Sequence, residues 1–170
     1  MSRQDEFRRA MPPVTDLDRK PVDPATSGAI THMLASTSVP VEHLAGLRHI
    51  VLHDGSIDTN AAMYMPKHRE IFVNTGARDW RDEAGTRRTF VHELGHHVHA
   101  MLNPQQFQSR PEQEAVAENY ADRHAPGGTS KYDQITGLGF STFNGSDHEA
   151  DIALYKRTRQ ARAMPDGGGL

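Results

Sequence analysis

Residues 89–99 read TFVHELGHHVH, and this stretch decides the fold of the chain. His92 and His96 are four residues apart, so on a helix they lie on one face, one turn from each other. Both can then direct a ring nitrogen to one metal ion about 2 Å away. Glu93 is rotated by roughly 100° from His92, so it lies outside that pair but within reach of water beside the ion. The stretch therefore predicts a metal-binding helix of the HExxH type.

The composition limits the class of protein. The chain has 19 basic and 22 acidic residues and a net charge of −3, which argues against nucleic acid as a partner. It has no cysteine, so disulfides and thiolate ligands are excluded and histidine is the main nitrogen ligand available. The sequence shows no 18-residue apolar run and no signal peptide. We therefore expect a soluble, cytoplasmic protein with no membrane partner, and leave signal-independent export or association with a virion open.

The mean hydropathy of −0.68 indicates that part of the chain is not packed. Residues 1–27 contain four prolines among charges, which predicts a flexible Pro-rich arm that could attach the protein to a larger assembly. Residues 28–163 are expected to form a single domain that ends in a helix over 146–163, and residues 164–170 form a Gly-rich tail. No internal repeat is visible.

The middle of the chain predicts a short helix followed by a small sheet. Residues 27–36 have apolar side chains at helical spacing, and 49–53 form an apolar run that a turn signal ends. The β-prone runs 62–65 and 70–74 flank a polar, Pro-containing connection and predict a hairpin or two adjacent strands. The run 62–65 is a candidate edge strand. It could accept an extended peptide as an added strand, or it could be an ordinary exposed meander.

The metal-binding helix is predicted to begin near residues 82–86 and to end near 102, with a buried apolar stripe that includes Phe90, Leu94 and Val98. Gly95 in its middle costs about 1 kcal/mol relative to alanine, which favours a position where another backbone segment packs closely. His97 is expected on the surface. His99 lies about 10 Å along the axis from His92, too far to share its ion.

A second helix is predicted over 110–124, because a Ser-x-x-Glu capping box and an early proline begin it. A catalytic zinc takes three protein ligands, and an antiparallel second helix would return an acidic ridge to the two histidines. Glu114, Glu118 and Asp122 form this ridge, since they are four residues apart. Either Glu114 is the third ligand and Glu118 accepts a hydrogen bond from a ligand histidine, or Glu118 is the ligand and Asp122 has the second role.

His92-Glu93-Leu94-Gly95-His96 followed by Glu114, Ala117, Tyr120 and Ala121 resembles the gluzincin metallopeptidases, especially the compact ImmA/IrrE-like and anthrax-lethal-factor-like domains. The resemblance covers roughly residues 49–124. It implies an α+β, zincin-like domain in which a small N-terminal sheet packs on the active-site helix and a glutamate-bearing helix follows. In that context Tyr120 aligns with the family's aromatic residue, which favours Glu114 as the third ligand; a thermolysin-like pattern would favour Glu118.

The resemblance implies a metalloendopeptidase with one Zn²⁺ per chain and a protein or peptide substrate. Glu93 would accept a proton from water activated by zinc and pass it to the leaving amine. Tyr132 and His148 are candidates for stabilising the oxyanion. The alternative is a non-catalytic structural or interaction protein, such as a component of a viral particle or a secretion assembly, that retains a metallopeptidase fold. The third histidine of metzincins and the G-x-S-x-G of serine hydrolases do not occur.

Overall fold

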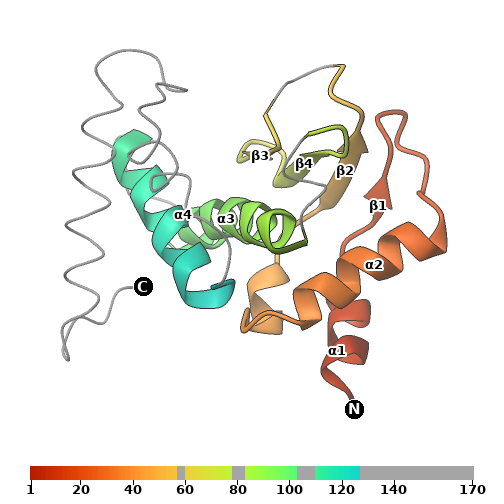
Figure 1. Cartoon of the computed structure of the whole chain (residues 1–170), viewed down its shortest axis with the longest axis horizontal. Helices are drawn as coiled ribbons and strands as arrows, with labels where there is room; N and C mark the ends of the chain where they lie inside the picture. Colours follow the sequence, from red (N-terminus) through yellow and green to blue (C-terminus); the bar gives the residue numbers. More distant parts are fainter. Residues whose placement is uncertain (57–59, 78–82, 103–109, 127–170) are drawn as a thin grey trace.

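The architecture is α+β, as the computed structural model shows for residues 1–56, 60–77, 83–102 and 110–126. In these residues a four-stranded mixed sheet is followed by two packed helices, α3 (Glu83–Leu102) and α4 (Arg110–His124). Helix α3 lies between the sheet and α4 (Figure 1). The predicted fold class and the two helices predicted to carry the site are confirmed.

The sheet has the order β1-β2-β4-β3, with β1 at Val14–Thr15, β2 at His49–His53, β3 at Ala62–Met65 and β4 at Glu70–Asn74. Strand β2 pairs in parallel with both β1 and β4, whereas β3 and β4 are antiparallel. The predicted strand pair is confirmed, and β3 is an edge strand of the described sheet. Because β3 also contacts α3, this strand lies beside the helix that carries His92 and His96.

The prediction of a flexible arm over residues 1–27 is wrong for the first half of that segment. Helix α1 (Arg3–Ala10) begins at a Ser2 cap, and the side chain of Phe7 is completely buried. The guanidinium of Arg3 donates to the carbonyl oxygens of Ala35 and Thr37, at 3.0 and 2.8 Å. Composition alone underestimates how firmly this segment packs, because one buried aromatic ring and one long cationic side chain attach it to the domain.

Helix α2 (Pro24–Ala35) also begins inside the predicted arm. The side chain of Asp23 accepts a hydrogen bond from the amide of Thr26 at 2.9 Å, and Pro24 occupies the first turn, where its missing N–H costs nothing. A 3-10 helix, η1 (Val41–Leu44), then leads into β2. The core that joins these elements to α3 consists of buried aliphatic and aromatic side chains, including Leu34, Leu44, Ile50, Ile71, Phe90 and Leu94.

Three sequence predictions lie wholly or partly outside the described residues: the helix over 146–163, the Gly-rich tail at 164–170 and the C-terminal limit of the domain. They stay predictions. Within the part of the chain that the structure describes, no helix combines the length and the apolar character needed to cross a membrane.

Candidate metal centre

Helix α3 places two histidines on one face. His92 and His96 are four residues apart, and their ring centroids are 5.0 Å from each other. The apolar side chains of Phe90, Leu94 and Val98 are buried in the core and fix the rotation of the helix. His92 is itself buried, with 7% of its surface exposed, so its ring nitrogens are shielded from water.

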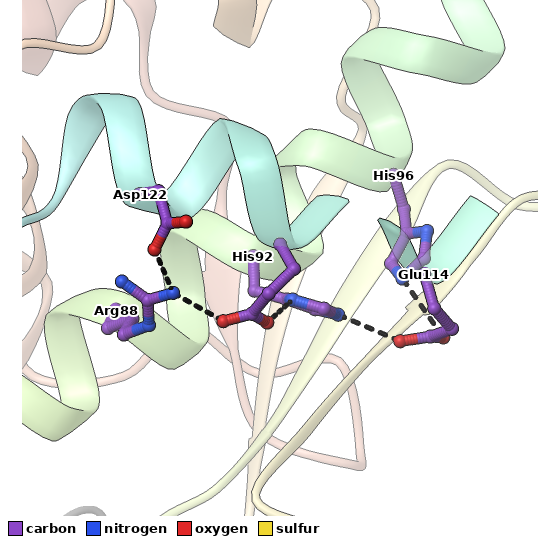
Figure 2. Close-up of polar contacts among 6 residues, drawn as sticks. Arg88, His92, His96, Glu114 and Asp122 are labelled. Atoms are coloured by element: carbon purple, nitrogen blue, oxygen red, sulfur yellow. Dashed lines mark hydrogen bonds and ion pairs between the residues drawn. The ribbon is translucent and has the colours of Figure 1, made fainter. Parts of the chain in front are cut away.

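Helix α4 returns a carboxylate to these histidines. The two oxygens of Glu114 lie 3.1 Å from His92 Nε2 and 3.3 Å from His96 Nε2. The three residues each offer one ligand atom, and these atoms lie within 4.8 Å of one another (Figure 2). Two imidazoles and one carboxylate are a donor set suited to a divalent transition metal. The group could therefore hold a metal ion, and it contains Glu114 rather than Glu118.

Glu118 lies one turn further along α4 and contacts the other side of His92. His92 Nδ1 donates to Glu118 Oε2 at 2.8 Å, which leaves Nε2 directed towards Glu114. This is the second role that the sequence left open for Glu118. A carboxylate in that place sets the orientation of a ligand histidine.

The contacts between α3 and α4 continue beyond the three candidate ligands. Arg88 Nη2 donates to both Glu118 Oε1 and Asp122 Oδ1, the latter at 2.6 Å (Figure 2). Three positions spaced by four on α3 thus face three spaced by four on α4, and the two helices run in opposite directions. We call this set the ladder; its members are Arg88, His92, His96, Glu114, Glu118 and Asp122.

Gly95 allows the two helices to lie this close. A Cβ atom at this position would be 3.0 Å from Tyr120 Cβ and 3.1 Å from Ala117 Cα, tighter than normal packing. Ala117 and Tyr120 are buried against α3. The close packing predicted at Gly95 is confirmed.

The charges around His92 favour a cation there. Burial alone would lower the pKa of His92, but hydrogen bonds to Glu114 and Glu118 outweigh it and raise the pKa to about 10. Burial alone would raise the pKa of Glu118, but the contacts with His92 and Arg88 outweigh it and lower the pKa to about 2. The pKa of Glu114 is also lowered, because both histidines outweigh the effect of burial. A positive charge between these carboxylates is favourable, and either protons or a divalent ion can supply it.

Glu93 is outside the candidate ligand group, as its position on the helix predicts. Its Oε2 accepts a hydrogen bond of 2.8 Å from the backbone amide of Tyr64, in edge strand β3. The carboxylate is therefore held between α3 and the sheet, close enough to His92 for its charge to raise the pKa of that histidine.

The expectation that His97 lies on the surface is wrong. His97 is completely buried, with Nε2 2.9 Å from the carbonyl of Ala45 and Nδ1 3.0 Å from the hydroxyl of Tyr64. Since a carbonyl only accepts, Nε2 carries the proton and Nδ1 accepts from Tyr64. His97 follows Phe90 by seven residues, so the apolar stripe of α3 already contained the signal for its burial.

Tyr132 and His148 lie outside the described residues, so their roles stay predictions. Sequence reasoning missed Arg88 and Tyr64. For Arg88 the signal was present, because it precedes His92 by four residues and so shares its helix face. For the Tyr64 amide no local signal exists, because its contact with Glu93 depends on how the sheet packs on α3.

Comparisons with protein-family models, with curated proteins and with solved structures found no match to this chain.

Proposed function

We propose that the protein is a zinc-dependent endopeptidase of the gluzincin type, with His92, His96 and Glu114 as the metal ligands. The observation that carries the proposal is the convergence of two histidines from one helix and a carboxylate from the next on one point. That geometry supports the identity of the site; the metal and the reaction come from the resemblance and from the chemistry of the donor set.

A divalent ion in this site would polarise a peptide carbonyl and lower the pKa of water. The chain itself would supply the base. Glu93 is anchored through one carboxylate oxygen by the Tyr64 amide, and the other oxygen remains to accept a proton from water and deliver it to the leaving amine.

Edge strand β3 supports a peptide as substrate. The strand contacts α3, and its Tyr64 amide donates to Glu93, so an extended chain added to this edge would pass near Glu93. The amide of Tyr64 is already engaged by Glu93, so the added chain would bond to other groups of the strand or compete with that contact.

The test has two parts. Elemental analysis should find one zinc per chain in the wild type and in Glu93→Gln, and no zinc in Glu114→Ala. Glu118→Ala should retain less than one zinc per chain. Wild type and Glu93→Gln are then incubated with a pool of unfolded proteins, and products are identified by mass spectrometry. Cleavage by the wild type alone supports the proposal. Equal activity of the two proteins refutes Glu93 as the base, and zinc without cleavage favours the structural alternative.

A further inference from the structure

Arg88 is a buried charge that the proposed reaction does not use. Its side chain comes from α3, one turn before His92, and only 6% of its surface is exposed. Removing a guanidinium from water is unfavourable unless good partners replace the water. Here Glu118 and Asp122, both on α4, take that place.

Glu118 connects Arg88 to the candidate ligands. One of its oxygens accepts from Arg88 and the other accepts from His92 Nδ1, so both ends of the carboxylate are fixed (Figure 2). An imidazole that donates from Nδ1 offers Nε2 to a metal. The orientation of the His92 ring therefore depends on a carboxylate that Arg88 holds.

We propose that Arg88 is a positioning residue of the metal centre. Its guanidinium fixes Glu118, and through Asp122 it also fixes the register of α4 on α3, so that His92 Nε2 and Glu114 meet at one point. The inference rests on the proposed function, since it requires that the site bind a divalent metal.

A simple charge argument gives the opposite result. A guanidinium near the site repels a divalent cation, so its removal would tighten binding if charge were all that Arg88 contributed. Positioning predicts weaker binding. The sign of the change in zinc affinity therefore separates the two.

The affinity for Zn²⁺ is measured by competition with a chromophoric chelator. We expect Arg88→Met and Arg88→Gln to bind zinc at least about tenfold more weakly, the scale found for partners that orient ligand histidines. Arg88→Lys keeps a cation that can reach both carboxylates and should stay within about threefold of wild type. Arg87→Met removes the same charge from a neighbouring position rotated by roughly 100° on α3, and is the matched control. Unchanged or tighter binding in both Arg88→Met and Arg88→Gln overturns the inference.

A double-mutant cycle distinguishes positioning from general helix packing. If Arg88 acts through Glu118, then Arg88→Gln added to Glu118→Gln should weaken zinc binding by less than about twofold further. Effects that multiply in full, both in this cycle and in the matching cycle with Asp122→Asn, would mean that Arg88 acts through neither carboxylate, and would overturn the inference. A wild type that binds no zinc overturns the proposed function and this inference together, whereas normal wild-type binding with unaffected Arg88 variants overturns the inference alone.

Discussion

Gly95→Ala should destabilise the protein even though alanine is the better helix former. At this position the added methyl group would lie 3.0 Å from Tyr120 Cβ and 3.1 Å from Ala117 Cα. Ala117 Cα belongs to the backbone of α4 and Tyr120 Cβ is bonded directly to it, so neither atom can rotate away. The two helices would have to separate by a few tenths of an ångström.

Two effects of opposite sign decide the magnitude. Glycine to alanine inside a helix stabilises by about 1 kcal/mol through propensity. Forcing an extra carbon into a packed interface costs about 1–3 kcal/mol. The net change in the free energy of unfolding should therefore be a loss of roughly 0–2 kcal/mol.

Gly28 supplies the matched control. It also lies within a helix, α2, but a Cβ atom there would have no neighbour within 4 Å. Gly28→Ala should therefore show only the propensity gain of about 1 kcal/mol. The two variants should differ by about 1–3 kcal/mol in urea unfolding, or by about 2–4 °C in Tm for each kcal/mol. If Gly95→Ala is stabilised as much as Gly28→Ala, the close contact between α3 and α4 is refuted.

Three further variants test packing away from the ligands. Phe7→Ala should reduce the free energy of unfolding by about 3–5 kcal/mol, because the ring is completely buried. Leu17→Ala, in the same segment but 40% exposed, should change this free energy little. Equally small effects of the two substitutions would mean that residues 1–27 form a flexible arm after all. His97→Ala should cost about 2–4 kcal/mol in the same urea assay, whereas a surface histidine would change stability by no more than about 0.5 kcal/mol. Burial lowers the pKa of His43 and His124, so the unfolded state binds more protons and stability should fall as the pH drops below about 6.5. The fall in Tm with pH should be smaller in the double variant His43→Gln/His124→Gln. An identical pH dependence in the variant and the wild type would contradict the lowered pKa of these two histidines.

The candidate site was largely predictable because its information is local. A spacing of four residues places side chains on one helix face whatever the rest of the fold does, so His92, His96 and the acidic ridge could be read from the sequence. The choice between Glu114 and Glu118 could not be made from spacing. A ridge with a repeat of four fits its partner helix equally well after a shift of about one turn.

Non-local contacts remove that ambiguity in the structure. Arg88 pairs with Asp122 at one end of the ladder, and Gly95 admits Ala117 and Tyr120 beside it. Together these contacts fix the register of α4. The N-terminal segment was mispredicted for a related reason, because the burial of Phe7 depends on elements far away in the sequence.

The ladder also links the fold to the chemistry. Its three carboxylates and one guanidinium leave a net charge of −2 when both histidines are neutral, inside an interface that is mostly buried. Such a charge is unfavourable away from water, so the folded state gains from two positive charges at this place. A divalent ion would provide both, and it would release the proton that His92 otherwise holds between the carboxylates. A metal ion held by the ladder would therefore stabilise the pairing of α3 and α4, and the pairing would favour binding of the ion.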